Sequence, residues 1–597
     1  MLIGLLALMM TGLPCLKGSS IQPDRFFYVI TEDTVTSAIA RDADRVKFEG
    51  LSESKLEAAL ARLDQPVEVR FVRCKFGKAA CKQVTTVGKC LQVLSMEGCS
   101  IVDDGRILNA LQTFRELRVL QIDGSIPDDQ RDTENTAHQL VALSELWTSD
   151  WTLLSRCSLP RLTSLSVASV TEPPTSLDLN KVCPMLRTVR LLGDDPSKRV
   201  CDLLLTCPLL NTIDLGWHST DLELPHDHKK GLADLVHRTE RVRVRQLPRN
   251  ADQVYQAIET ATLLVRLELI DCDWAPGLIA ALQRNTSIRE LSVDSAFEPD
   301  SMKALIASTR ITKFEFAKTT SLKVLNGIAP DRLGAIELQA PTFYCNDPRQ
   351  LASLANVANL AVLSLVADPE MSQSDRDKVE EELTKLFSQA RLRSLDLRWI
   401  DWLSEGFLKQ LLELRSLSSL ALNHLPLLGK DTRSIENLDS LLIVSMRSDD
   451  DWGQINRMQY LKSLVICDCT DFGSKAAEVL KSIAGMLNLA ISTRTGFSAE
   501  VCSVLFGKSG LRRLCLRSQT TIAFPNADVV KACSLEVLAL MCPHLSAQDL
   551  QTLGVAPKLR YVVLQDGAAS DESRMEYLQS RPGVEMVRTQ TVSDFDR

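Results

Sequence analysis

The chain has 597 residues and a formal net charge of −8. Non-specific nucleic-acid binding needs an excess of cations, so this balance argues against a nucleic-acid partner. After the N-terminal stretch, no apolar run approaches the roughly 18 residues that a membrane-spanning helix needs. We therefore expect no transmembrane segment beyond a possible N-terminal signal.

The first ten residues form an apolar stretch that is typical of the hydrophobic part of a secretory signal. Gly18 and Ser20 would supply small residues at a cleavage site, but no Lys or Arg precedes the stretch. Residues 1–20 are therefore either a signal peptide or an apolar N-terminal cap, with a further cap over 21–45. The seventeen cysteines form no dense cluster at either end, although exported proteins tend to pair them. The compartment stays open between secreted or extracytoplasmic and cytoplasmic.

A short unit of two apolar residues flanking one variable residue returns about every 25 residues. Examples are Leu94-Ser95-Met96 and Leu267-Glu268-Leu269. The spacing has the period of two of a strand with one buried face. Intervening segments such as 275–282 and 473–480 carry apolar residues at helical spacing. Because one unit cannot bury its own apolar edge, the units must stack and share a core.

The first residues of these cores, the anchors, define roughly 22 units. They predict one repeat array over residues 46–590, followed by a tail at 591–597. The anchors are Val46, Val69, Leu94, Leu120, Leu165, Val189, Ile213, Val242, Leu267, Leu291, Phe314, Ile336, Leu363, Leu395, Leu420, Leu441, Leu464, Leu489, Leu514, Leu538, Val562 and Val587.

Residues 91–99, 264–272 and 461–469 follow the pattern Leu-x-x-Leu-x-Leu-x-x-Cys. On these residues the chain resembles the leucine-rich repeat family, and is closest to its cysteine-containing and ribonuclease-inhibitor-like subtypes. The resemblance implies an α/β solenoid (a horseshoe) with parallel strands on the concave face and helices or extended segments on the convex face. It also implies that the cysteine at this position, with Cys74 in the same place, bonds to backbone groups of the turn.

Two longer spacings interrupt the register. One lies between Leu120 and Leu165 and contains a polar stretch, 127–134, followed by a helix-like segment, 137–146. The other holds 372–387, whose charged run is typical of a solvated helix face. We interpret both as enlarged helices on the convex side rather than as functional insertions.

Catalytic and metal-binding patterns are weak. His226 and His228, with Asp227 between them, could begin a metal site, but Lys229 and Lys230 disfavour a cation and no further ligand is identifiable. A polar connecting loop is the preferred interpretation. No local motif joins a nucleophile to a base. We expect no enzyme activity, no metal and no cofactor.

On the concave face, residues between the anchors should point outward. Basic and acidic groups adjoin in the middle of this row. Such fields favour oriented docking with a charged partner, or alternatively pair with each other. The basic residues are Arg190, Arg241, Arg243 and Arg245, with Arg266 nearby, and the acidic residues are Glu268, Glu290, Asp294, Glu315 and Glu337.

Toward the C-terminus the outward row becomes apolar, which predicts an exposed patch of the kind that marks a partner surface. The alternatives are that long neighbours such as Arg513 and Arg517 cover the row, or that tight curvature buries it. A slip of one residue in register would reverse inward and outward positions. The candidate residues are Leu442, Val465, Ala490, Ala539 and Val563, with Ala421 and Cys515 in the same row.

These observations together favour a non-enzymatic protein–protein interaction module that binds a protein partner on its concave face. The alternative is a substrate-recognition subunit of a ubiquitin-ligase-like complex, because the cysteine-containing repeats resemble those of such receptors.

Overall fold

The computed structural model describes residues 28–31, 45–63, 66–101, 104–123, 138–149, 151–168, 172–192, 197–216, 226–247, 251–294, 297–316, 320–339, 342–345, 347–357, 360–389, 392–412, 414–425, 437–446, 449–469, 472–565, 568–570, 573–574, 577, 581 and 584–589. The possible signal peptide at 1–20, the polar stretch at 127–134 and the tail at 591–597 lie outside these residues. Within them, no helix is long and apolar enough to cross a membrane.

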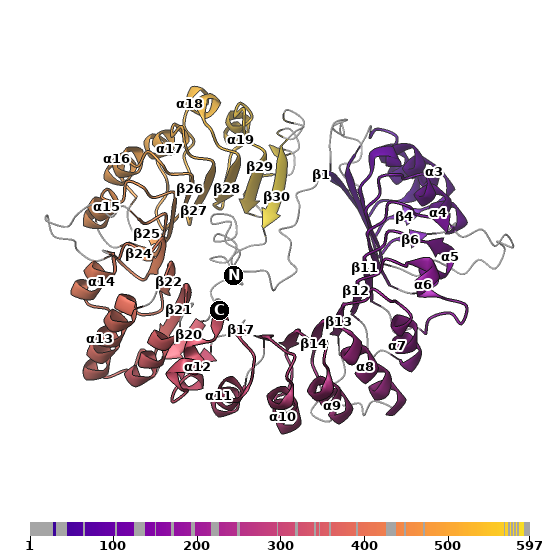
Figure 1. Cartoon of the computed structure of the whole chain (residues 1–597). Helices are drawn as coiled ribbons and strands as arrows, with labels where there is room; N and C mark the ends of the chain where they lie inside the picture. The colour runs from indigo at the N-terminus through magenta and orange to yellow at the C-terminus, as the bar shows by residue number, and fades with distance from the viewer. Residues whose placement is uncertain are drawn as a thin grey trace. The chain divides into compact units, whose positions relative to one another are not determined.

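The chain divides into two compact units, which we describe separately. The N-terminal unit is Phe27–Lys318, and the C-terminal unit is Thr319–Arg597 together with Met1–Phe26. In each unit the strands line the inner side of an arc and the helices lie on its outer side (Figure 1).

Two large parallel sheets carry the strands, one of 14 strands and one of 12. The first sheet has, in spatial order, β1 (Tyr28–Thr31), β2 (Arg45–Glu49), β3 (Glu68–Val72), β5 (Val93–Glu97), β7 (Val119–Asp123), β9 (Glu145–Thr148), β11 (Ser164–Val167), β12 (Thr188–Leu191), β13 (Thr212–Gly216), β14 (Arg241–Arg245), β15 (Arg266–Ile270), β16 (Glu290–Asp294), β17 (Lys313–Phe316) and β19 (Glu337–Gln339). The second has β18 (Thr320–Ser321), β20 (Thr342–Cys345), β21 (Val362–Ala367), β22 (Ser394–Leu397), β23 (Ser419–Leu422), β24 (Ser440–Met446), β25 (Ser463–Cys469), β26 (Asn488–Thr493), β27 (Arg513–Ser518), β28 (Val537–Met541), β29 (Tyr561–Gln565) and β30 (Glu585–Thr589). Two short pairs join β4 (Lys75–Phe76) to β6 (Ser100–Ile101) and β8 (His138–Gln139) to β10 (Cys157–Ser158).

Helices connect many of the successive strands of each sheet. In the N-terminal unit they are α2 (Glu53–Leu60), α3 (Lys78–Val87), α4 (Asp104–Gln112), α5 (Thr152–Arg156), α6 (Leu179–Val182), α7 (Lys198–Leu205), α8 (His226–Arg238), α9 (Asp252–Thr260), α10 (Pro276–Arg284) and α11 (Pro299–Ser308). In the C-terminal unit they are α12 (Pro330–Gly334), α13 (Gln373–Gln389), α14 (Glu405–Leu412), α15 (Asp449–Ile455), α16 (Ser474–Ser482), α17 (Ala499–Phe506), α18 (Ala527–Ala532) and α19 (Ala547–Leu553). Three short 3-10 helices are Gly88–Cys90, Leu322–Val324 and Pro348–Asn356.

The apolar anchors form the core between strands and helices. Leu267, Leu291 and Phe314 lie opposite one another on consecutive strands and are at most 1% exposed. Burying one such side chain contributes about 1.5–3 kcal/mol, and the contribution recurs in every repeat because each strand stacks on the next. The predicted leucine-rich repeat fold, with parallel strands on the inner face and helices on the outer face, is therefore confirmed.

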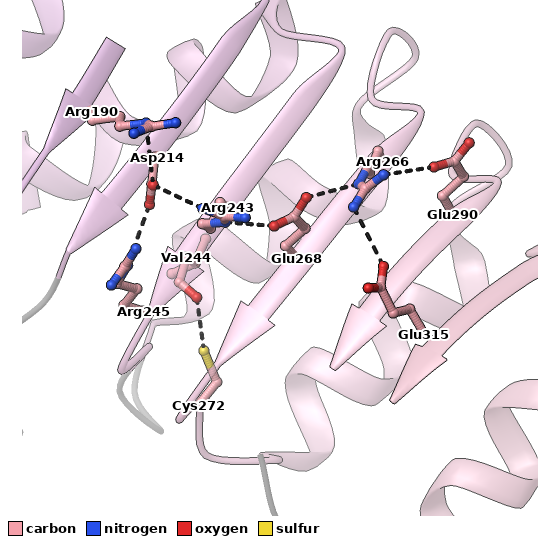
Figure 2. Close-up of polar contacts among 10 residues, drawn as sticks. All are labelled: Arg190, Asp214, Arg243, Val244, Arg245, Arg266, Glu268, Cys272, Glu290 and Glu315. Atoms are coloured by element: carbon pink, nitrogen blue, oxygen red, sulfur yellow. Dashed lines mark hydrogen bonds and ion pairs between the residues drawn. The ribbon is translucent and has the colours of Figure 1, made fainter. Parts of the chain in front are cut away.

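The turn cysteines behave as the resemblance implies. The Sγ atom of Cys272 donates to the backbone carbonyl of Val244, on the preceding strand, at 3.4 Å (Figure 2). The backbone N–H of Leu247 donates to the same Sγ at 3.4 Å. In the same way, the Sγ atom of Cys74 donates to the backbone carbonyl of Phe48, on the preceding strand, at 3.4 Å. Each of these thiols thus links its own turn to the preceding repeat.

Two of the helix expectations have opposite outcomes. The charged helix expected at 372–387 is confirmed as α13. The helix expected over 137–146 is wrong, because β8 and β9 occupy this segment. Leu140, Leu143 and Leu146 are buried, and their spacing of three is shared by a helix face and by the Leu-x-x-Leu start of a repeat. Leu146 is a missed anchor, opposite Leu120 and Leu165.

The last predicted anchor is out of register. Val587 lies opposite the outward-facing Val563, whereas Met586 lies opposite the anchor Val562. Residues 584–587 carry apolar side chains in both phases of the alternation, which is why the pattern misplaced the anchor by one position.

The histidine pair was also placed wrongly. His226 and His228 do not lie in a connecting loop, because α8 begins at His226. The side chains of both histidines lie outside the described residues. Among the described residues, no group of three His, Cys, Asp or Glu residues could hold a metal ion.

Candidate functional site

The charged residues of the N-terminal unit meet on the inner face of β12 to β17. Parallel pairing places Arg190 opposite Asp214, Asp214 opposite Arg243, and Arg243 opposite Glu268. On β14, Val242 and Val244 are buried while the intervening arginines point to the inner face. We use the name charged strip for Arg190, Asp214, Arg243, Arg245, Arg266, Glu268, Glu290, Lys313 and Glu315.

Asp214 is the most buried member of the charged strip, with a side chain only 5% exposed. Its Oδ2 atom lies 3.4 Å from Nη1 of Arg243 and 4.0 Å from Nε of Arg190, and its Oδ1 atom lies 3.6 Å from Nε of Arg245. A buried carboxylate is costly unless opposite charges surround it. Three guanidinium groups from the two neighbouring strands β12 and β14 meet this requirement (Figure 2).

Glu268 joins the two halves of the charged strip. Its Oε2 atom accepts from Nε of Arg243 at 2.5 Å, and its Oε1 atom accepts from Nε of Arg266 at 2.8 Å. The Nη1 atom of Arg266 donates to Oε2 of Glu290 at 3.3 Å, and its Nη2 atom donates to Oε2 of Glu315 at 3.5 Å (Figure 2). The ion pairs therefore run without a break from β12 to β17.

Burial by itself lowers the pKa of the Arg243 guanidinium, but its interactions with Glu268 and Asp214 outweigh this effect and raise the pKa overall. Arg243 therefore carries its charge as a fixed part of the charged strip. Side chains that are held in this way lose little further rotamer freedom when a partner docks.

The alternative that the charges pair with each other is confirmed for most of the predicted charged residues. The exposed ends of the charged strip nevertheless differ in sign. Arg190 and Arg245 are 42% and 38% exposed at one end, and Glu290 and Glu315 are 35% and 30% exposed at the other. Two more predicted residues of the N-terminal unit lie on the same inner face: the exposed Arg241 and the half-buried Asp294. Glu337 is half-buried on β19 and belongs to the C-terminal unit.

Sequence reasoning did not include Asp214, the centre of the site, among the candidate residues, and it also missed Lys313. The Nζ atom of Lys313 lies 3.8 Å from Oε2 of Glu290 on the neighbouring strand. Aligning the repeats on their anchors would have brought Asp214 between Arg190 and Arg243, so the order of charges across repeats is the signal that locates it.

The apolar row of the C-terminal unit is contiguous, as expected. Val465, Ala490, Cys515, Ala539 and Val563 lie opposite one another on β25 to β29. We use the name apolar row for these five residues with Met541. Leu442 and Cys467 are partly buried and pack against it.

The expectation that the apolar row is exposed is wrong. Its members range from 0% exposed at Val563 to 5% at Cys515 and Met541. The side chains cluster across adjacent strands, and the half-buried Arg513 and Arg517 flank Cys515 on the same face of β27.

The described cysteines are thiols. Burial raises the pKa of Cys157, Cys201, Cys502 and Cys515 to about 12. A thiol with so high a pKa is protonated at neutral pH and is a poor nucleophile.

No family model matches the chain, and no curated protein matches it. Solved structures with similarity include that of the TLR13–ssRNA13 complex, with a TM-score of 0.42 and 15% identity over 91% of this chain and 73% of that chain. A second is a leucine-rich repeat protein of Leptospira interrogans, with a TM-score of 0.25 and 10% identity over 93% of this chain and 97% of that chain. The repeated parallel register and the buried anchors identify the architecture as a leucine-rich repeat solenoid.

Proposed function

We propose that this chain is a non-enzymatic interaction module that binds a protein partner on the inner face of the N-terminal unit. The observation that carries the proposal is the charged strip: an internally paired network whose exposed ends have opposite sign. Its interior pairs hold the side chains in place, and its ends supply charges for a partner.

The sign of each end defines the chemistry of the partner. An acidic group of the partner would face Arg190, Arg241 and Arg245, and a basic group would face Glu290 and Glu315. Complementary charge at two separated points sets the orientation of the partner and increases the association rate. A partner with the reversed arrangement would be repelled at both ends.

Charge reversal at the basic end tests the proposal. Proteins recovered from an extract by the wild-type chain are compared with those recovered by Arg190→Glu plus Arg245→Glu. The matched control is Lys181→Glu plus Arg284→Glu, which makes the same change in net charge on α6 and α10, outside the strip. We expect the strip variant to lose the partner by at least about tenfold, and the control to retain it.

Salt provides a second readout, because exposed charge interactions are screened beyond a Debye length of about 10 Å at 0.1 M. Recovery by the wild-type chain should therefore fall as the salt concentration rises. Equal recovery by the wild-type chain and the strip variant at low salt would contradict the proposal.

A substrate-recognition subunit of a ubiquitin-ligase-like complex is a narrower form of the same proposal. It is supported by the resemblance of the cysteine-containing repeats. Co-recovery of ubiquitin-ligase scaffold proteins by both the wild-type chain and the strip variant would favour it, because the scaffold would bind away from the strip.

A further inference from the structure

Three consecutive repeats of the N-terminal unit enter their strands through the same turn. In each turn the backbone N–H of a leucine donates to the carbonyl three residues earlier: Leu162 to Leu159 at 3.1 Å, Leu186 to Cys183 at 3.1 Å, and Leu210 to Cys207 at 3.4 Å. The second residue of each turn is a proline, which favours this geometry. The third residue is exposed, so each repeat presents this side chain to the solvent.

The third turn residues line up across the strands. Strand pairing places Thr188 opposite Thr212, and the backbone ladder continues before the strands, where the N–H of Asn211 donates to the carbonyl of Arg187 at 3.0 Å. Counting back three residues from each aligned strand position gives one row at the edge where β11 to β15 begin. We use the name edge row for its five members: Arg161, Met185, Leu209, Arg238 and Leu263.

The edge row is largely apolar and exposed. Met185, Leu209 and Leu263 are 41%, 42% and 52% exposed. Val265, two residues after Leu263, is 43% exposed. Exposed apolar residues that are scattered singly are common, whereas neighbouring ones mark surfaces that contact a partner. Met185 and Leu209 are such neighbours, because they lie on adjacent repeats about 4.8 Å apart.

The fold does not require apolar side chains at this edge. In the C-terminal unit, the equivalent residues before β26 to β29 are Gly485, Gly510, Ser534 and Lys558. Before β25 the position holds Tyr460, a single large side chain that is 60% exposed. The apolar edge row is therefore a property of particular repeats in the N-terminal unit and not of leucine-rich repeat turns in general.

Basic side chains flank the apolar members of the edge row. Arg161 and Arg187 are exposed, and neither has an ion-pair partner among the residues that the structure describes. The Nη1 atom of Arg238 donates to the backbone carbonyl of Leu205 at the end of α7, which holds this guanidinium at the edge. The edge-row residues and those two positions later include three arginines and one glutamate, Glu240. The edge is therefore complementary to an acidic ligand.

We propose that the edge row binds an acidic amphipathic helix of a partner protein. The row spans four strand spacings, about 19 Å, which a helix covers with about 14 residues. If the first apolar residue of the helix is i, residues i−3, i, i+3, i+7 and i+10 match the five edge-row positions along the axis to within about 1 Å. The helix has carboxylates at i−3 and i+7, opposite Arg161 and Arg238, and aliphatic side chains at the other three positions.

A protein helix fits the edge row better than an anionic membrane does. Helix recognition uses a few apolar contacts at helical spacing, whereas membrane binding scales with the apolar area that is buried. The edge row is a single line of side chains, and Glu240 beside it would repel an anionic surface. This site is separate from the charged strip, so it does not depend on the function proposed above.

Fluorescence anisotropy of a labelled synthetic peptide with the full chain tests the proposal. The peptide carries leucine at i, i+3 and i+10 and glutamate at i−3 and i+7, and a scrambled peptide of the same composition is the reference. Met185→Glu plus Leu209→Glu should weaken binding at least about tenfold, because apolar contacts are lost and like charges are introduced. Tyr460→Glu plus Leu487→Glu makes the same change in charge at exposed apolar positions of the C-terminal unit and should leave binding unchanged.

A second variant, Arg161→Ser plus Arg187→Ser, keeps the apolar side chains and removes two charges. It should weaken binding and reduce the dependence of binding on salt, because the ionic part of the contact is lost. Circular dichroism checks that each variant is folded. If the glutamate variant unfolds, the serine variant decides the outcome.

The proposal is overturned if neither peptide binds, if the scrambled peptide binds equally well, or if the edge-row variants bind like the wild-type chain. Loss of peptide binding in the charged-strip variant Arg190→Glu plus Arg245→Glu, with the edge-row variants unaffected, would place the peptide on the inner face instead. Binding to equimolar phosphatidylserine–phosphatidylcholine vesicles without binding to the peptide would replace the helix by a membrane. None of these results bears on whether the charged strip has a partner of its own.

Discussion

The inner faces of the two units are built on the same backbone pattern and differ in chemistry. In both units the anchors lie opposite each other from strand to strand and are buried. In the N-terminal unit the outward row is the charged strip, and in the C-terminal unit it is the apolar row. The fold therefore constrains the anchors and leaves the residues between them open to variation.

The difference also shows two ways of stabilising an outward row. Charged side chains such as Asp214 and Glu268 are stabilised by neighbours of opposite sign, and the strip stays partly accessible at residues such as Arg190 and Glu290. Apolar side chains such as Val563 have no such pairing and are removed from water altogether. Substitutions that exchange these properties should therefore destabilise both units, each for a different physical reason.

The largest expected effect is that of Val563→Asp. A carboxylate at a position with 0% exposure loses its hydration without gaining a partner, so the free energy of unfolding should fall by at least about 3 kcal/mol. Ala421→Asp, at the half-buried equivalent position on β23, is the matched control and should change it by about 1 kcal/mol or less. Urea unfolding followed by circular dichroism measures both. Similar small losses in the two variants would show that the apolar row is accessible to water.

Asp214→Ala should have the next largest effect. Removing this carboxylate leaves Arg190, Arg243 and Arg245 close together without their shared counter-charge, at a cost of about 3 kcal/mol. Glu315→Ala is the control, because Glu315 is 30% exposed and makes one ion pair at 3.5 Å, and it should cost about 1 kcal/mol or less. The two values come from the same urea experiment. If both variants lost equal stability, the centre of the charged strip would not lie at Asp214.

Alkaline pH should destabilise the protein through its buried thiols. The pKa of Cys515 is raised to about 12 by burial, whereas an exposed thiol has a pKa of about 8.5. Between these values the unfolded chain has released the proton and the folded chain has kept it. The stability from this thiol is thus complete below about pH 8.5 and falls by about 1.4 kcal/mol per pH unit above it.

Cys515→Ala should reduce this alkaline slope, measured as the change in unfolding free energy between pH 8 and pH 10. Cys502→Ala should do the same, because burial also raises its pKa to about 12. An unchanged slope in both variants would contradict the raised pKa values of these two thiols.

The smallest expected effect is that of Cys272→Ala, which removes the thiol that contacts the carbonyl of Val244 and the N–H of Leu247. A net hydrogen bond is worth about 1 kcal/mol, so the loss of unfolding free energy should be of this order. Cys272→Ser keeps a donor and an acceptor and should be less destabilising than alanine. The reverse order would mean that packing, and not hydrogen bonding, selects cysteine at this turn.

Most of the fold could be predicted from local spacing. The alternation on β14, with Val242 and Val244 buried between arginines, follows from a period of two. Prediction failed where one spacing has two meanings: Leu143 and Leu146 match a helix face as well as a repeat. It also failed at Val587, where both phases of the alternation are apolar.

The candidate site was harder to predict, since it depends on contacts between repeats. Which carboxylate contacts which guanidinium follows from strand register and side-chain length, so Asp214 is recognised as the centre only in three dimensions. The exposure of Val563 cannot be derived from its own strand, because it depends on the side chains that pack around it.

The charged strip has a consequence for how the repeats can be rearranged. Repeats of a solenoid are usually interchangeable, because each presents the same anchors to its neighbours. Excision of the repeat that contains β14 would preserve the anchors but bring Asp214 opposite Glu268, two like charges about 5 Å apart. The order of repeats between β12 and β17 is thus fixed by electrostatics, and a deletion there should be tolerated less well than deletion of a repeat whose outward residue is uncharged.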